Sequence, residues 1–320
     1  MKRRDAVLAL AATALAPFAR AEAKYPSQVL KLVAPFPPGG TVDILSRALA
    51  EALGRELGQA VIVDNRGGAG GTIGADIVSK APADGYTVLF GAVHHAIAQS
   101  VYPKLGYDIR KMTPIGLLGR VNHAVIVTNS LPAKNVQELV DLLKAAPVKY
   151  SYATPGAGTM QHLMTELFKS VTGTNMAHIP YRGSGPAMVD LISGNTQVMF
   201  ETMPSALQHI RAGSVRAIAV TGAQRASYLP TVPTIAQSGA PNYDATSWYG
   251  LFAPAGTPAS VVERLNQAVN AVFGNRKFVE QWIALGADPG GGTAEQLAKL
   301  TSSEVERWAA VAKNASITVQ

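Results

Sequence analysis

Short apolar runs recur along the first part of the chain and alternate with longer stretches whose apolar residues have helical spacing. Short apolar runs bounded by turn residues predict buried strands. The predicted elements are strands at 29–34, 60–64, 87–91 and 122–128, and helices over 42–57 and 72–79. This alternation indicates a parallel sheet with helices on both faces.

The pattern restarts further along the chain. Val136, Leu139, Leu142 and Leu143 have the spacing of one face of a helix. The elements predicted in this second stretch are helices over 136–145, 160–172 and 186–193, and strands at 150–153, 177–180, 198–201 and 215–221. It predicts a second α/β unit that does not repeat the sequence of the first.

One more strand is predicted at 247–253. Two or three helices then close the chain, at 260–273, 278–285 and 294–312. The closing helices can pack back on the first unit, so the second unit becomes an insertion reached by two crossing strands, near 122–128 and 247–253. The expected fold class is α/β, with two lobes joined by two hinge strands. The expected division is a signal peptide at 1–23, a first lobe at 24–124 plus 248–320, and a second lobe at 125–247. Ligand sites favour such interfaces between domains.

The first residues have the three-part layout of a secretory signal peptide. Lys2, Arg3 and Arg4 give a positive start, residues 6–16 are apolar, and small residues recur at 19–23. The apolar run is shorter than the roughly 20 residues that span a bilayer. We expect export to the periplasm, by the general route or, because Arg3 and Arg4 are adjacent, by the twin-arginine route. The alternative is a buried core helix.

Composition and charge exclude several kinds of site. The chain has no cysteine, which excludes disulfides, thiolate metal sites and cysteine nucleophiles. Its formal charge of +7 becomes +4 if cleavage after Ala21 removes four basic residues and one acidic residue. The remaining Lys and Arg are scattered, whereas a nucleic-acid binder concentrates them on one face. We expect no nucleic-acid partner and a small anionic ligand.

Neither a cofactor nor a metal is expected. The glycine loop at 65–72 follows a strand, but it matches neither Gly-x-Gly-x-x-Gly with a downstream acid nor Gly-Lys-Ser/Thr. His94 and His95 are adjacent and the other histidines are isolated, without the convergent spacing of metal ligands.

The stretch Ala-Pro-Phe-Pro-Pro-Gly-Gly-Thr-Val-Asp, at 34–43, joins the first strand to the first helix. Gly39 and Gly40 allow a sharp turn and a close approach to a ligand, and Thr41 is expected to cap the helix. The free N–H groups and the dipole of a helix start suit a carboxylate or phosphate. The alternative is an ordinary Pro-Gly turn.

Two turns precede helices in the second lobe. The turn at 153–159 places Thr159 at a helix start, so each lobe would supply one anion-binding turn, as in a clamp over a dicarboxylate. The turn at 181–186 offers the N–H groups of Gly183 and Ser184 as direct contacts. Arg182 could also pair with a carboxylate, or form a salt bridge at the surface.

Further candidates follow two predicted strands. Glu201 ends a strand at the sheet edge where α/β proteins bind ligands. It could accept a hydrogen bond from a ligand amine or hydroxyl, or pair with Arg182. Ala92 and His94 follow the strand at 87–91 and are expected in the cleft wall.

A secreted hydrolase is the alternative to a receptor. It would use His94, His95 or His162 with Asp43 and would turn over a carboxylate derivative. The sequence lacks a Gly-x-Ser-x-Gly elbow, and no nucleophile–base pair is evident. We therefore expect a receptor that binds its ligand without catalysis.

An ordered set of segments carries a family resemblance. The segments are Pro35-Phe-Pro-Pro-Gly-Gly-Thr-Val-Asp43, Asn65-Arg-Gly-Gly-Ala-Gly-Gly-Thr72, Pro82-Ala-Asp-Gly-Tyr86, Tyr181-Arg-Gly-Ser184, Ala219-Val-Thr221, Val232-Pro-Thr234 and Trp248-Tyr-Gly-Leu-Phe-Ala-Pro254. Together with the signal peptide they resemble the substrate-binding receptors of tripartite tricarboxylate transporters, the Bug family, over essentially the whole mature chain.

The resemblance implies a type II periplasmic-binding-protein fold with Venus-flytrap closure and a carboxylated ligand held partly through ordered waters. The implied contacts are Phe36, Pro38, Gly39, Gly40, Thr41 and Asp43 in the first lobe and Thr154, Gly158, Thr159, Tyr181, Gly183 and Ser184 in the second. The implied partner is a two-component membrane permease. Some relatives serve sensing, so a membrane sensor kinase is the alternative partner.

Two departures from the family pattern touch the cleft. The family often has Ser/Thr-His-Ala-Ile-Asn-Pro after the third strand, where this chain has His94-His95-Ala-Ile-Ala98-Gln99. It often has Phe-Asp-Asn where this chain has Phe200-Glu201-Thr202. The ligand therefore stays open among citrate-like, dicarboxylate, amino-acid and aromatic-acid compounds.

Overall fold

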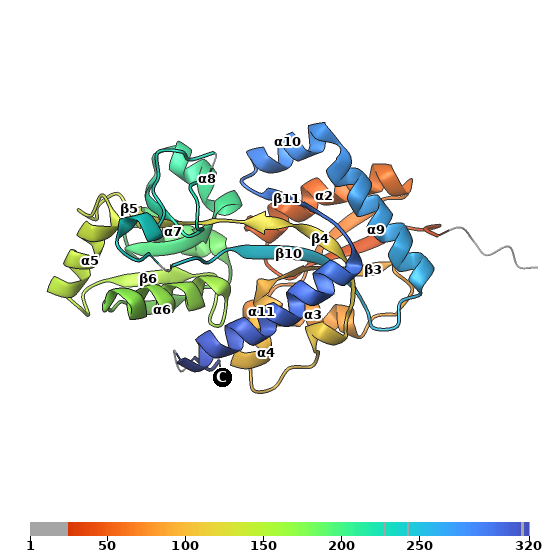
Figure 1. The fold of residues 1–320 in the computed structure, drawn as a ribbon, viewed down its shortest axis with the longest axis horizontal. Helices are drawn as coiled ribbons and strands as arrows, with labels where there is room; N and C mark the ends of the chain where they lie inside the picture. The colour runs from red at the N-terminus through yellow and green to blue at the C-terminus, as the bar shows by residue number, and fades with distance from the viewer. Residues whose placement is uncertain (1–24, 227, 242, 315–316, 320) are drawn as a thin grey trace, which may run out of the picture.

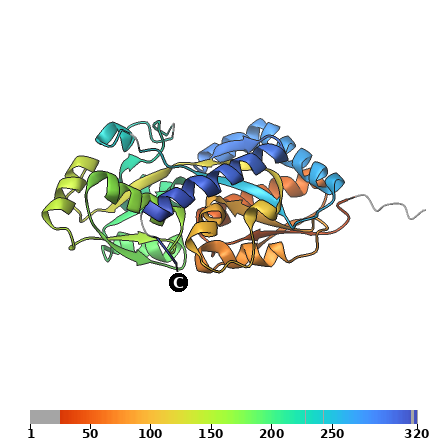
Figure 2. The same cartoon turned by 60° about the horizontal axis from the view of Figure 1, so that its bottom comes forward.

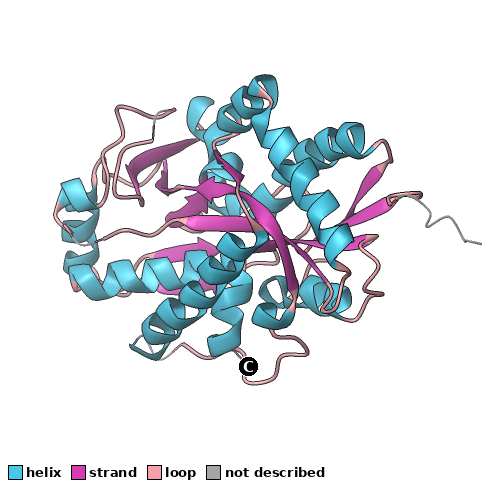
Figure 3. Cartoon of the chain, turned by 45° about the vertical axis from the view of Figure 1, so that its right-hand side comes forward, coloured by secondary structure: helices cyan, strands magenta, loops and turns pink. Residues whose placement is uncertain are grey.

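The computed structural model describes residues 25–226, 228–241, 243–314 and 317–319, so the predicted signal peptide lies outside the described residues. Within them the chain forms two separate sheets, each with its own helices (Figure 1). In both halves of the molecule most helices lie outside and the strands lie inside (Figure 3).

A six-stranded sheet forms the first lobe. Its strands are β1 (Leu30–Ala34), β2 (Val61–Asn65), β3 (Thr87–Ala92), β4 (Thr113–Val121), β10 (Ser247–Ala253) and β11 (Asp288–Gly291). Their order is β11–β4–β10–β3–β1–β2. The accompanying helices are α2 (Thr41–Leu57), α3 (Thr72–Ser79), α4 (Val93–Val101), α9 (Ala259–Gly274), α10 (Arg276–Ala284) and α11 (Ala294–Asn314).

A five-stranded sheet forms the second lobe. Its strands are β5 (His123–Thr128), β6 (Ser151–Thr154), β7 (Ala177–Pro180), β8 (Val198–Thr202) and β9 (Val215–Val220), in the order β7–β6–β8–β5–β9. The accompanying helices are α5 (Val136–Ala145), α6 (Met160–Thr172), α7 (Ser184–Ser193) and α8 (Met203–Arg211).

The parallel sheets predicted from the strand–helix alternation are in fact mixed. β1 is parallel to β2 and β3, and β6 is parallel to β7 and β8. In contrast, β10 is antiparallel to both β3 and β4, and β5 is antiparallel to β8 and β9. The cause is connectivity, because β5 and β10 enter their sheets from the opposite lobe.

Four elements were missed by the sequence pattern: β4, β11, α4 and α8. Pro114, Gly116 and Gly119 interrupt the apolar pattern of β4, and residues of these types weaken a strand signal. β4 accommodates them through irregularities in its register with β10. α4 follows β3 without a polar N-cap residue, since Ala92 occupies that position.

The chain passes between the lobes twice. Only Asn122 separates the end of β4 from the start of β5, which belongs to the other sheet. The return segment follows β9 and ends at Ser247, whose Oγ lies 3.3 Å from Nε2 of His123. The two passages therefore lie side by side, as a hinge between two lobes requires (Figure 1).

Large aromatic side chains fill the interior. Trp248, Trp282 and Trp308 are essentially inaccessible to solvent. Trp248 lies on β10, close to the hinge, and Trp308 lies on α11. α11 packs along α4, and its last turns reach the second lobe (Figure 2). The apolar cores thus pack against the elements that adjoin the hinge.

Replacing the buried Trp248 by alanine should lower the free energy of unfolding by about 3–5 kcal/mol, because the lost contacts leave a cavity. The midpoint of urea-induced unfolding measures this change. The matched control is Val148→Ala, since the side chain of Val148 is 86% exposed and its removal should leave the midpoint unchanged. Equal midpoints for the two variants would contradict the packing described here.

Candidate functional site

A narrow cavity lies between the two lobes, at the carboxyl ends of their strands. Its walls come from α2 and the loop before it, from α4, from the starts of α6, α7 and α8, and from β10. The lining residues are Phe36, Pro37, Pro38, Gly40, Thr41, Val42, His94, Pro155, Gln161, Gly183, Ser184, Gly185, Pro186, Thr202 and Tyr249. The open space is about 30 Å³, which is too small for a dicarboxylate in this arrangement of the lobes.

Helix starts from both lobes converge on this cavity. The N-cap residues of α2, α7 and α8, which are Gly40, Gly183 and Thr202, line it directly. His94 and Gln161 contribute from the first turns of α4 and α6. None of the lining residues, all of them within the described ranges, is Lys, Arg, Asp or Glu. Backbone N–H groups and helix dipoles, rather than charged side chains, are therefore what this wall offers to an anion.

The turn at 34–43 caps α2 with a different residue from the one predicted. Gly40, not Thr41, is the N-cap of α2, and the first backbone bond of the helix runs from the N–H of Ile44 to Gly40. The N–H of Gly39, which has φ of +88°, donates to Oδ2 of Asp43 over 3.1 Å. That N–H is therefore already used, and neither Gly39 nor Asp43 lines the cavity.

Asp43 stabilises the turn and makes no contact with the cavity. Oδ1 of Asp43 lies 2.8 Å from the guanidinium of Arg47, one helical turn away. Burial alone would raise the pKa of Asp43, but hydrogen bonds from Arg47 and from the N–H of Gly39 lower it below its usual value. The carboxylate thus holds the loop in the shape that presents Gly40 and Thr41.

Neutral groups connect the two lobes. The hydroxyl of Thr41 bonds with the hydroxyl of Thr202 and lies 2.8 Å from Oγ of Ser205. Across the cleft, Nδ1 of His94 accepts the N–H of Met160 over 3.1 Å. Burial lowers the pKa of His94 to about 3, so the ring stays neutral and can accept this bond. These contacts define a closed arrangement of the lobes.

The turn at 153–159 lines the cavity through Pro155, and its other residues lie outside the lining. The hydroxyl of Thr159, the N-cap residue of α6, donates to the carbonyl of Gly156 over 2.8 Å. Thr154 bonds with Nε2 of His178, and the N–H of Gly158 donates to Nδ1 of His162. These three residues therefore bond within the second lobe, and none of them lines the cavity.

The turn at 181–186 supplies part of the wall, in a different way from that predicted. Gly183 lines the cavity, but its N–H donates to the carbonyl of Pro155 over 2.9 Å. Ser184 lines the cavity as well. The hydroxyl of Tyr181 donates to Asp190 over 2.6 Å and Arg182 is exposed. Of the two N–H groups predicted as contacts, that of Gly183 is used within the protein, and that of Ser184 stays a prediction.

Glu201 lies directly behind the cavity wall and is fully buried. Its Oε1 accepts the N–H of Thr202 over 2.8 Å and the hydroxyl of Thr202 over 2.5 Å. Among the ion pairs of the described residues none involves Glu201, so the predicted pairing with Arg182 is not formed. Burial raises the pKa of Glu201, although hydrogen bonds from Thr202 oppose the rise.

The structure brings seven predicted residues to the cavity and leaves eight outside its lining. The seven are Phe36, Pro38, Gly40, Thr41, His94, Gly183 and Ser184. The eight are Gly39, Asp43, Ala92, Thr154, Gly158, Thr159, Tyr181 and Glu201. Among the lining residues that sequence reasoning missed are Gln161, two residues after Thr159, and Thr202, which follows Glu201. For Gln161 the available signal was its place in the first turn of the helix predicted at 160–172, whereas the helix after Thr202 was not predicted.

The histidines do not form the catalytic set that a hydrolase requires. The partners of Asp43 are Gly39 and Arg47, not a histidine. His94 bonds with the backbone of Met160, and the ring of His95 bonds with the backbone of Ala92 and Gly71. Asp43, His94 and His95, which the hydrolase alternative would use, therefore form hydrogen bonds with other groups and not with one another.

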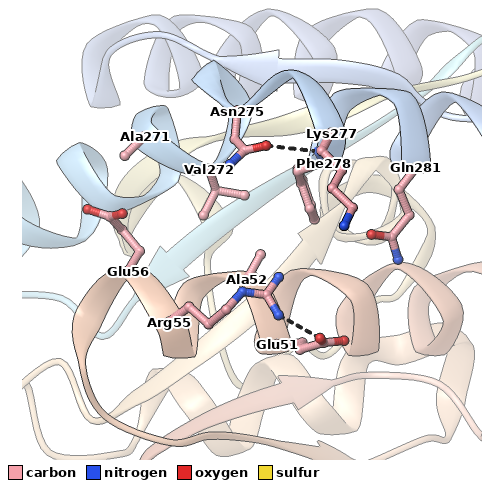
Figure 4. Close-up of a pocket in the computed structure, with 10 residues that line it drawn as sticks. All are labelled: Glu51, Ala52, Arg55, Glu56, Ala271, Val272, Asn275, Lys277, Phe278 and Gln281. Carbon is pink, nitrogen blue, oxygen red and sulfur yellow. Dashed lines mark hydrogen bonds and ion pairs between the residues drawn. The ribbon is translucent and has the colours of Figure 1, made fainter.

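A second hollow, of about 680 Å³, lies on the first lobe alone (Figure 4). Arg55 and Glu51 of α2 face Lys277 and Gln281 of α10 across it. None of the predicted site residues lies there. Across the described part of the chain, no cluster of three or more possible metal ligands occurs, and no helix is both long and apolar enough to span a bilayer.

Comparison with known proteins identifies the family. The model described as tripartite tricarboxylate transporter family receptor matches residues 45–317. The structure of R. palustris Rpa4515 with adipate is 38% identical, with a TM-score of 0.90 over 92% of this chain and 99% of that chain. The periplasmic binding protein BugD is 35% identical, with a TM-score of 0.88 over 92% of this chain and 100% of that chain.

A third structure agrees with this fold. MatC from Rhodopseudomonas palustris with bound malate is 29% identical, with a TM-score of 0.85 over 90% of this chain and 99% of that chain. The two-lobed α/β fold and the family resemblance predicted from the sequence are thereby confirmed. The chain belongs to the receptors of the tripartite tricarboxylate transporter family.

Proposed function

We propose that the chain is a periplasmic receptor that captures a small carboxylate between its lobes and delivers it, without catalysis, to a two-component membrane permease. The convergence of helix starts from both lobes on an uncharged cavity carries this proposal. Adipate in Rpa4515 and malate in MatC show that related receptors hold carboxylates. The permease and the export signal are inferred from the family.

The binding chemistry follows from the helix starts. Each helix N-terminus carries about half a positive charge, and its first N–H groups have no partner within the helix. A carboxylate oxygen can accept such N–H groups at Thr41 and Val42 in α2 and at Ser184 in α7. Fixed dipoles require no buried cation to be stripped of water. The site therefore suits an anion of modest size.

Closure couples binding to delivery. We assign the lobes as the sequence predicts, 24–124 plus 248–320 and 125–247, except that His123 and Ala124 belong to β5 of the second lobe and Ser247 to β10 of the first. The passages at Asn122 and Ser247 form the hinge. In the closed form Thr41 meets Thr202 and Ser205 across the cleft. A ligand bridging the helix starts of both lobes adds contacts that only the closed form can make. It therefore shifts the population towards that form, which the permease recognises.

Gly40→Asp should abolish carboxylate binding and leave the fold intact. Gly40 is an N-cap residue with φ of −89°, and a Cβ there meets only Ser184 atoms, at 3.9 Å. Aspartate is a good N-cap residue, but its charge occupies the anion site. We expect at least a 100-fold rise in Kd, about 2.7 kcal/mol, measured by titration calorimetry with the best carboxylate from a thermal-shift panel that includes adipate and malate.

Gly40→Ala is the matched control, because it adds the same Cβ without a charge. It should bind with nearly wild-type affinity. Undiminished binding by Gly40→Asp, with both variants folded, would show that the helix starts do not hold the carboxylate. If the wild-type protein binds none of the carboxylates in the panel, the proposed function itself is contradicted.

Stability should fall as the pH drops from about 6.5 towards 4. Burial lowers the pKa of His94 and His123 to about 3 and that of His95 to about 4. The unfolded chain protonates its histidines near pH 6.5, whereas the folded chain does not, so acid favours unfolding. Urea midpoints between pH 7.5 and 4.5 measure the loss.

Imidazole NMR signals separate this cause from acid effects on carboxylates. In the folded protein these three rings should keep neutral chemical shifts down to about pH 4.5, while in urea they titrate near pH 6.5. A ring of His94 that titrates near pH 6.5 in the folded protein would contradict its burial against Met160.

A further inference from the structure

Three stacked rings lie in the second lobe beside the turn at 153–159. The rings of His162, on α6, and His178, on β7, have centroids 4.0 Å apart and planes 16° apart. The ring of Tyr152, on β6, stacks on the ring of His178 at 4.8 Å. The carboxylate-binding chemistry proposed above leaves these three rings without a role.

Both histidines bond to the turn. Nδ1 of His162 accepts the N–H of Gly158 over 3.2 Å. The hydroxyl of Thr154 donates to the carbonyl of Gly156 over 3.2 Å and lies 2.7 Å from Nε2 of His178. The bond from Gly158 requires a free lone pair on Nδ1 of His162, so it exists only while that ring is neutral.

The same turn and the residue that follows it carry two hydrogen bonds between the lobes. The hydroxyl of Tyr102, which follows α4 in the first lobe, donates to the carbonyl of Ala157 over 3.2 Å. Burial raises the pKa of Tyr102, so this donor keeps its proton. The N–H of Met160 donates to Nδ1 of His94, and Pro155 lines the cavity. The shape of the turn therefore affects both closure and the cavity wall.

A positive charge on His162 is disfavoured in this arrangement. The ring lies in the first turn of α6, where the helix dipole opposes a cation. Glu166 attracts such a charge, but its Oε1 already accepts from the hydroxyl of Tyr152 at 2.5 Å and from the ammonium group of Lys169 at 2.7 Å. Burial lowers the pKa of His162, and it lowers that of His178 to about 3.

We propose that His162 makes the closure of the lobes sensitive to acid: its neutral ring holds the turn in the closed shape, and protonation at Nδ1 removes the bond from Gly158 and favours the open form. This inference rests on the proposed function and adds regulation by pH to it. The open form tolerates the proton, because the turn then has no contact with the first lobe to maintain. Carboxylate binding, which needs the closed form, therefore weakens in acid.

The size of the effect follows from linkage. A histidine that titrates near pH 6.5 in the open form and stays neutral in the closed form favours binding fully above pH 6.5. Affinity is lost as the pH falls, by about 30-fold between pH 7.5 and 5.0. His94 also bonds across the cleft and contributes in the same direction, so substitution is needed to isolate the share of His162.

Titration calorimetry at pH 7.5 and 5.0 tests the proposal with adipate, malate and the panel carboxylate that binds the wild-type protein most tightly. A glutamine side chain can accept from the N–H of Gly158 and does not titrate. His162→Gln should therefore reduce the rise in Kd between the two pH values by at least about 10-fold relative to wild type. His162→Leu removes the acceptor, so it should bind more weakly than His162→Gln at pH 7.5.

His209→Gln is the matched control, because His209 lies in the last turn of α8 and outside the stack. This variant should keep the wild-type pH dependence. Thermal melting at both pH values checks that each variant is folded.

Imidazole NMR on the wild-type protein tests the proposal without any variant. With carboxylate bound, the ring of His162 should carry its proton on Nε2 and stay neutral at pH 5.5. Without carboxylate, the same ring should titrate closer to pH 6.5.

The outcomes are distinguishable. If wild type and His162→Gln lose affinity equally on acidification, or if the proton of His162 lies on Nδ1 at pH 7.5, the role of His162 is overturned while the receptor function stands. If no carboxylate of the panel binds the wild-type protein at pH 7.5, the proposed function fails and the pH regulation fails with it.

Discussion

The unpaired N–H groups at the starts of five helices are the constraint on which this site depends. Such groups have no partner within the helix, so at a buried helix start something else must bond to them. Here α2, α4, α6, α7 and α8 begin around one cavity that contains no charged lining side chain. Some N–H groups are used within the protein, as Met160 is by His94. Those that remain are the groups to which the proposed function assigns the ligand carboxylate.

The hinge allows the helix starts of the two lobes to close around a ligand. Because Asn122 alone separates β4 from β5, a rotation at this point would carry all the helix starts of one lobe together. The contacts between the lobes are hydroxyls and a neutral imidazole, which are individually weak. The closed form therefore gains stability from whatever bridges the lobes, and the open form remains accessible for release.

The sequence predicted the two-lobed fold because apolar runs such as the one in β8 are buried on both faces and carry a clear signal. It missed β4, whose Pro114 and Gly116 are tolerated only through irregular pairing with β10. At the site, Gly40 and Ser184 were predicted because a glycine-rich turn before a helix has a local signature. Gln161 was not, since its place in the cavity depends on how α6 packs against the other lobe.

Affinity and selectivity have different physical sources in this fold. Helix starts attract any carboxylate, because a dipole distinguishes charge but not the rest of a molecule. Discrimination requires side chains whose hydrogen bonds only some ligands satisfy, and an unpaired buried acceptor penalises the wrong ligand more than a good contact rewards the right one. In this cavity the polar side chains of Gln161 and Ser184 lie in the wall, where they are placed to discriminate in this way. Substitutions there would change selectivity while the backbone at the helix starts stays the same.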